Sequence, residues 1–99
     1  MRMHDQNERH GVQLLHADTL RFLDEVVDEV DRARAKFFSS DGCMTALTEE
    51  VGELAKAMLD ESQSRIREEA VQVAAMALRV AIEGDATLSE YRARRGIKD

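Results

Sequence analysis

The segment from residue 65 to residue 83 is apolar around most of a helix, and this width limits the folds open to the chain. At about 100° per residue, its apolar side chains cover about 220° of the helix circumference, whereas one packing neighbour needs only about 100°. The segment must therefore be covered on two sides at the centre of a helical bundle, either by two helices of the same chain or, as the small core favours, by a second subunit. The chain has no proline and no sustained period-two alternation, so the pattern favours helices and indicates no sheet.

The same periodicity predicts an all-α fold, a helical hairpin bundle of three long helices and one short C-terminal helix. The predicted helices cover residues 12–38, 43–61, 65–83 and 88–95. They form a single domain at 12–95, between a flexible tail at 1–11 and a frayed end at 96–99. Gly84 is well placed to end the third helix. Because a chain of 99 residues with 4% aromatic residues builds only a small core, we expect oligomerisation to complete the bundle.

Charge and composition exclude several classes of function. A protein with a net charge of −6 gains no affinity from the release of counterions when it meets nucleic acid, so DNA or RNA binding is disfavoured. No apolar run approaches the length that spans a membrane, and the N-terminus lacks the apolar stretch of a signal peptide. The single Cys43 excludes an internal disulfide and fits a cytoplasmic location. A buried thiol is the favoured interpretation of Cys43, with a nucleophile as the alternative.

Two acidic clusters within otherwise apolar helices are the main candidate for a functional site. Glu49, Glu50 and Glu53 share one face of the second predicted helix, at spacings of three and four residues. Glu69 and Gln72 repeat the spacing of three on the third helix. If these helices form an antiparallel hairpin, the two groups can face each other and supply the oxygen ligands that Mg²⁺ takes.

Two other interpretations of these carboxylates compete with a magnesium site. A solvated acidic face, with its repulsion relieved by cations such as Lys56, is the usual origin of such strings. A di-iron centre in a helical bundle normally uses Glu-x-x-His on two helices. No Glu-x-x-His occurs in the chain, so the sequence argues against di-iron chemistry.

At these residues the chain resembles the MazG-like superfamily of all-α nucleoside triphosphate pyrophosphohydrolases. That superfamily includes dimeric dUTPases, dCTP pyrophosphatases and phosphoribosyl-ATP pyrophosphohydrolases. Its signature is EExxE on one helix and ExxD on the next. The first half is present as Glu49-Glu50-Val51-Gly52-Glu53 and the second as Glu69-Ala70-Val71-Gln72. The resemblance covers roughly residues 33–85, and it departs from the family pattern at Gln72, which stands where the family has Asp.

The resemblance implies a Mg²⁺-dependent enzyme, with Mn²⁺ as an alternative cofactor. Such an enzyme hydrolyses a (d)NTP between the α- and β-phosphates and works as a dimer or tetramer. The implied metal ligands are Glu50, Glu53 and Glu69, with Gln72 in the place of the family's Asp. Glu49 would position or activate the attacking water. Because Gln72 removes one carboxylate, the alternative is a catalytically degenerate module that binds nucleotides or serves helical interactions.

The resemblance also points to candidate substrate-binding residues. The end of the first helix and the following loop usually shape the base pocket, and here they include Lys36 and Phe37. Phe37 would stack on a base, or else belong to the core. Lys56 and Arg79 are candidates for phosphate contacts, with solvated cations that pair with nearby Glu as the alternative. The sequence does not decide which base or sugar is preferred.

Overall fold

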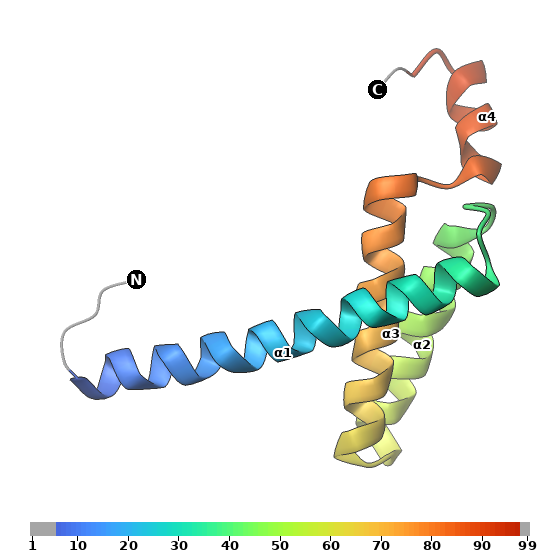
Figure 1. Ribbon diagram of the computed structural model, residues 1–99. Coiled ribbons are helices and arrows are strands. Elements are labelled where there is room, and N and C mark those ends of the chain that lie inside the picture. Colours follow the sequence, from blue (N-terminus) through green and yellow to red (C-terminus); the bar gives the residue numbers. More distant parts are fainter. Residues whose placement is uncertain (1–5, 98–99) are drawn as a thin grey trace.

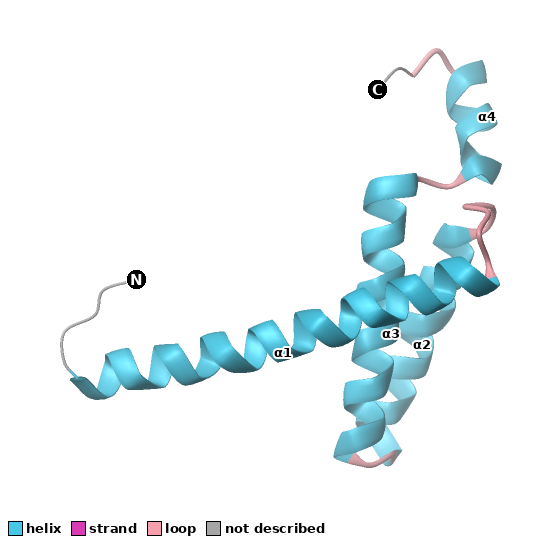
Figure 2. Ribbon diagram, viewed as in Figure 1, coloured by secondary structure: helices cyan, strands magenta, loops and turns pink. Residues whose placement is uncertain are grey.

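The computed structural model describes residues 6–97, with the side chains of residues 16–97, and these residues form four helices and no strand (Figures 1 and 2). The helices are α1 (Gln6–Lys36), α2 (Cys43–Asp60), α3 (Gln63–Glu83) and α4 (Ala86–Arg94). The predicted all-α fold is confirmed. Residues 1–5 of the expected tail and 98–99 of the expected C-terminal end lie outside the described residues.

Helix α3 lies between α1 and α2, as the width of its apolar face predicted. Helices α2 and α3 form an antiparallel hairpin, and α1 crosses it (Figure 1). Both α1 and α2 pack against α3, whereas α4 projects beyond the end of α3 and packs against none of the other described helices. Helix α3 is therefore the central element of the fold.

Small and β-branched side chains form the core between α1 and α3. Val26 and Val30 of α1 and Val71 and Ala75 of α3 are buried there, and partly buried neighbours pack around them: Phe22, Ala74 and Leu78. On the side of α2, Ala57 is fully buried. These short side chains allow the close approach of helix backbones that the alanine-rich sequence of α3 suggested.

All four helices differ from the predicted bounds by one or more residues at one or both ends, and the starts of α1 and α3 have a clear cause. Helix α1 begins at Gln6 rather than at residue 12, because Gly11 is accommodated inside the helix at a cost of about 1 kcal/mol. Helix α3 begins at Gln63 rather than at residue 65, because the Ser62 hydroxyl accepts a hydrogen bond from the Arg65 amide at 3.3 Å and caps the helix. Gly84 ends α3 with a φ of 69°, which glycine tolerates.

The molecule is extended and leaves much apolar surface in solvent. Its radius of gyration is 17.4 Å, whereas a compact domain of this length has about 13 Å. On α2, the apolar side chains of Val51 and Met58 are exposed. Other large apolar side chains are exposed along α1, just after its end, and near the end of α2: Leu20, Leu23, Val27, Phe37, Phe38 and Leu59. Among the described helices, none is long and apolar enough to cross a membrane.

Candidate functional site

A cavity of about 610 Å³ lies where the end of α1, the following loop, the start of α2 and the middle of α3 meet. Six of the residues singled out in the sequence line this cavity: Lys36, Phe37, Glu49, Glu50, Gln72 and Arg79. Glu53, Lys56 and Glu69 are not among the lining residues. The structure thus brings both halves of the acidic pattern to one side of the fold, with Glu50 at the edge of the cavity.

Glu50 of α2 and Glu69 of α3 meet across the hairpin. Burial raises the pKa of Glu50, and the charge of Glu69, a hydrogen bond with Glu69 and the charges of Glu53 and Glu49 raise it further. Glu69 is buried, with 8% of its surface exposed. Two carboxylates in this arrangement repel each other unless a proton or a cation lies between them.

Arg65 supplies a counter-charge to one member of this pair. Its Nη2 donates to Glu69 Oε1 at 2.7 Å, one helical turn along α3. In the described part of the chain, no basic side chain forms an ion pair with Glu49, Glu50 or Glu53. The acidic side chains of α2 therefore remain unbalanced, while Glu69 is neutralised.

The donor set fits Mg²⁺ only in combination with a substrate. Within residues 16–97, no three His, Cys, Asp or Glu side chains gather closely enough to hold a metal ion by themselves. Mg²⁺ at phosphate-transfer sites, however, is usually bound by one or two carboxylates together with substrate phosphates and water. Glu50 and Glu69 provide two such carboxylates, and a dication would relieve the repulsion that raises the pKa of Glu50. The chemistry of these donors suits a shared protein–substrate site rather than a closed protein cage.

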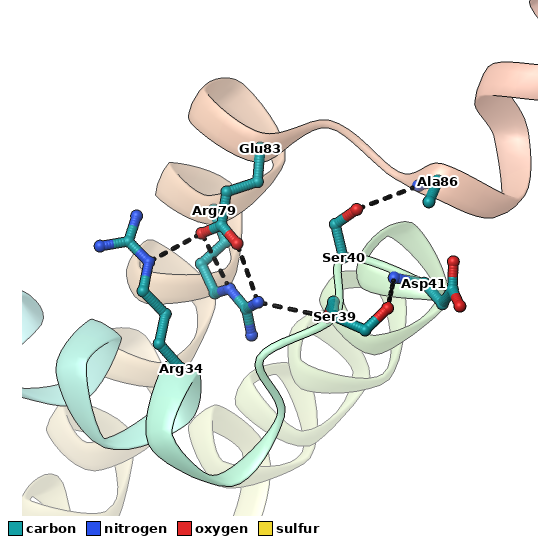
Figure 3. Close-up of polar contacts among 7 residues, drawn as sticks. All are labelled: Arg34, Ser39, Ser40, Asp41, Arg79, Glu83 and Ala86. Atoms are coloured by element: carbon teal, nitrogen blue, oxygen red, sulfur yellow. Dashed lines mark hydrogen bonds and ion pairs between the residues drawn. The ribbon is translucent and has the colours of Figure 1, made fainter.

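Arg79 forms part of the cavity wall and holds the end of α3 to the loop after α1 (Figure 3). It is 2% exposed, and its guanidinium donates to both carboxylate oxygens of Glu83 at 2.9 and 3.1 Å and to the Ser39 carbonyl at 3.3 Å. Arg34 of α1 donates to the same Glu83 at 2.9 Å. These hydrogen bonds from Arg79 and Arg34 lower the pKa of Glu83 to about 2. Arg79 is thus a buried, charge-balanced residue rather than a solvated cation.

Asp85, between α3 and α4, fixes the start of α2. Its carboxylate accepts hydrogen bonds from the backbone amides of Met44 at 2.8 Å, Gly42 at 3.2 Å and Thr87 at 2.9 Å. The bond from Met44, followed by those from Gly42 and Thr87, lowers the pKa of Asp85, against the effect of its burial. Asp85 therefore caps α4 and also satisfies amides at the start of α2, which has no capping side chain of its own.

Lys36 and Phe37 form the mouth of the cavity at the end of α1. Phe37 is 61% exposed, so its assignment to the core is wrong. The Lys36 ammonium lies 5.3 Å from the centre of the Phe37 ring, within range of a cation–π contact. Both side chains are accessible to a ligand. Lys56 is exposed on α2 and lies outside the cavity wall.

Some further residues of the cavity wall were not singled out in the sequence. They include Glu29, Arg32 and Met76. Arg32 donates to Glu29 Oε1 at 2.8 Å, so this pair adds a balanced charge to the wall. Both lie on the α1 face that carries Lys36, at spacings of four and seven residues, and this periodicity is the signal that could have identified them. Cys43 is a free, buried thiol, as its favoured interpretation predicted.

Comparisons of the chain with protein families, with curated proteins and with solved structures find no match.

Proposed function

We propose that the chain is a Mg²⁺-dependent nucleoside triphosphate pyrophosphohydrolase that converts a (d)NTP and water to a (d)NMP and pyrophosphate. The observation that carries this proposal is that Glu50, which lines a cavity of about 610 Å³, interacts with the buried Glu69 of the neighbouring helix. That volume lies in the range of about 300–1,000 Å³ typical of small-molecule sites. The EExxE pattern supports the same assignment.

In this proposal, the acidic residues divide the work. Glu50 and Glu69 would hold Mg²⁺ together with the substrate phosphates, and Glu53 and the Gln72 amide oxygen are the further donors that the sequence pattern implies. Glu49, which lines the cavity, would orient the attacking water. The bound Mg²⁺ would neutralise charge on the phosphates during in-line attack.

The basic and aromatic side chains at the end of α1 are proposed to bind the nucleotide. Lys36 places positive charge on the cavity wall, where phosphates would lie, whereas Glu29 balances the charge of Arg32. Phe37 offers an exposed ring for stacking on the base. Arg79 contributes by shaping the wall, because Glu83 already balances its charge. The reducing cytoplasm is the proposed location, since the only cysteine is a free thiol.

A homodimer or homotetramer is part of the same proposal. The exposed apolar side chains of α1 and α2 and the large radius of gyration favour burial against a second copy. Light scattering across a range of protein concentrations tests this point. A particle of at least twice the 11.2 kDa chain mass is expected, and a monomer at all concentrations would contradict it.

A second candidate is a catalytically degenerate module that binds nucleotides or another helical protein. It is favoured by Gln72, a neutral residue in the acidic pattern, and by the absence of a three-member metal cluster within residues 16–97. This candidate predicts stabilisation by nucleotides without release of pyrophosphate.

Pyrophosphate release from a panel of canonical and damaged (d)NTPs distinguishes the two candidates. We expect release with Mg²⁺ or Mn²⁺ and none with EDTA. Glu53→Gln should abolish turnover while the protein stays folded and oligomeric, and Glu90→Gln on the exposed face of α4 is the matched control. Full turnover in Glu53→Gln, or silence of the folded wild type across the panel, would reject the enzymatic proposal.

A further inference from the structure

Helix α4 projects beyond the end of α3 and packs against none of the other described helices (Figure 1). It has only nine residues, whereas an isolated helix shorter than about 12–15 residues is marginal in water. Asp85 caps its start, but the side chains of Leu88 and Tyr91 remain exposed along its length. Because a helix this short gains most of its stability from packing, α4 needs a surface to pack on.

A groove of about 490 Å³ lies between α4, the end of α3 and the start of α2. We call it the α4 groove, and its wall includes Ile82, Leu88 and Arg92. Two carboxylates also line it, but Glu83 is bonded to arginines and Asp85 to backbone amides. The groove therefore combines apolar side chains with a basic residue of α4, and its acidic residues are already balanced.

The C-terminal end of the chain is basic, although the chain as a whole is acidic. Residues 86–97 contain three arginines and one glutamate, whereas the whole chain has a net charge of −6. Arg92 and Arg95 fall on the same side of α4 as Leu88, at spacings of four and seven residues. Among the described residues, Arg94 and Arg95 form no ion pair. This end of the molecule therefore suits a partner that presents apolar side chains and carboxylates.

Helix α1 carries a surface of this kind. An exposed stripe along it, the α1 stripe, consists of Leu20, Leu23 and Val27. Asp24 and Asp31 border the stripe, each four residues after one of its members, and neither forms an ion pair among the described residues. Figure 1 shows this part of α1 well separated from α4. The two surfaces of one chain therefore do not meet each other.

We infer that the α1 stripe of one copy of this chain docks in the α4 groove of a second copy. This inference rests on the oligomer of the proposed function and names its contact surface. The occupant is a second copy because the chain itself supplies both complementary surfaces. In a symmetric dimer the contact occurs twice, with apolar side chains at its centre and the α1 aspartates facing the α4 arginines at its rim. Docking gives α4 the packing partner that it lacks in the single chain.

A charge-exchange experiment on the full chain tests this docking. One variant carries Arg94→Glu and Arg95→Glu, and the other carries Asp24→Arg and Asp31→Arg. In analytical ultracentrifugation, each variant alone should dimerise about tenfold more weakly than wild type, because attractive pairs at the rim become repulsive. An equimolar mixture of the two variants should dimerise within about threefold of wild type, because every contact then joins opposite charges. Rescue by mixing requires that the contact joins two chains.

Lys56→Glu is the control for net charge. It reverses a charge with the same sign as in α4, at an exposed site on α2 that forms no ion pair among the described residues. Its dimerisation should stay within about twofold of wild type, because a single distant surface charge is largely screened by salt. Circular dichroism of each variant checks that its helices are retained.

Each outcome of the mixing experiment has a defined meaning. Full dimerisation of both charge variants alone, with loss of the dimer in Val51→Glu on the exposed side of α2, rejects the α4 groove and leaves the oligomer standing. A mixture of folded variants that dimerises as weakly as its components rejects the pairing of α4 with α1. A wild type that is monomeric at all concentrations rejects the oligomer and this inference together. None of these measurements depends on pyrophosphate release, so the enzymatic proposal is tested separately.

Discussion

Replacement of Glu83 by Gln tests whether the ion-pair network at the end of α3 holds the cavity wall together. Glu83 accepts hydrogen bonds from Arg79 of α3 and Arg34 of α1, and Arg79 also reaches the loop after α1 through the Ser39 carbonyl (Figure 3). Glu83→Gln keeps the shape of the side chain but removes its charge. The buried Arg79 guanidinium is then left without a counter-charge.

The expected loss of stability follows from the pKa of Glu83. A pKa lowered from the ordinary 4.5 to about 2 sets a ceiling of roughly 3.4 kcal/mol on the contribution of this carboxylate at neutral pH. Solvent reaches the network, because the side chains of Glu83 and Arg34 are 21% and 42% exposed. We therefore expect about half of the ceiling, or ~1.5 kcal/mol, to be lost in Glu83→Gln at pH 7.

The same argument fixes the pH dependence. Because the folded-state pKa is depressed, the stabilisation is fully present above about pH 4.5 and is lost as the pH falls through about 2. Urea denaturation of wild type and Glu83→Gln should give a difference in unfolding free energy that shrinks to less than half between pH 7 and pH 3. Glu90→Gln, on the exposed α4, should change the unfolding free energy by less than about 0.5 kcal/mol. A Glu83→Gln difference that is equally small, or that does not change with pH, would refute the reasoning.

Two further predictions concern the acidic pair. In EDTA, Glu50→Gln should raise the melting temperature, because it removes a partly buried carboxylate whose pKa is raised by burial and by Glu69. Since the pKa of Glu50 is raised in the folded state, the wild type should lose stability relative to Glu50→Gln as the pH rises through and above 4.5. A higher melting temperature for the wild type than for Glu50→Gln at pH 7 would contradict this prediction. Gln72→Asp should tighten Mn²⁺ binding about tenfold in calorimetry by adding a carboxylate at the cavity, with Gln63→Asp on the exposed start of α3 as the control. Equal Mn²⁺ affinities in Gln72→Asp and wild type would remove Gln72 from the proposed ligand set.

The central position of α3 was predictable because it depends on one local property, the width of an apolar face. The end of α3 at Gly84 was predictable for a similar reason, since a positive φ at a helix end favours glycine. The contact between Glu50 and Glu69 follows once α2 and α3 are known to be antiparallel, because each glutamate occupies a fixed face of its helix. These features are encoded within a few turns of the chain.

The contacts that frame the cavity join residues far apart in the sequence, and no local pattern indicates them. Asp85 bonds to the amide of Met44 across 41 residues, and Arg79 bonds to the carbonyl of Ser39 across 40. Sequence reasoning could place Arg79 on a polar strip of α3 but could not show that Glu83 and the loop would bury it. The exposure of Phe37 was missed because helical spacing predicts burial only within a packed helix, and α1 ends at Lys36, one residue before Phe37.

The distribution of balanced and unbalanced charge argues for a site rather than loose packing at the acidic edge. Arg79 and Glu83 neutralise each other, and Asp85 is satisfied by three amides. Glu50 lines the same cavity and is partly buried. It interacts with the carboxylate of Glu69, and Glu50 itself has no ion pair with a basic side chain in the described part of the chain. No buried side-chain N or O atom in the described part lacks a hydrogen-bond partner, so the strain at Glu50 comes from partial burial and like charge rather than from a missing bond. Strain of this kind is expected where a ligand supplies the missing charge. Gln72 lines the same cavity as Glu50, and because Gln72 is neutral it limits the charge repulsion in the ligand-free protein.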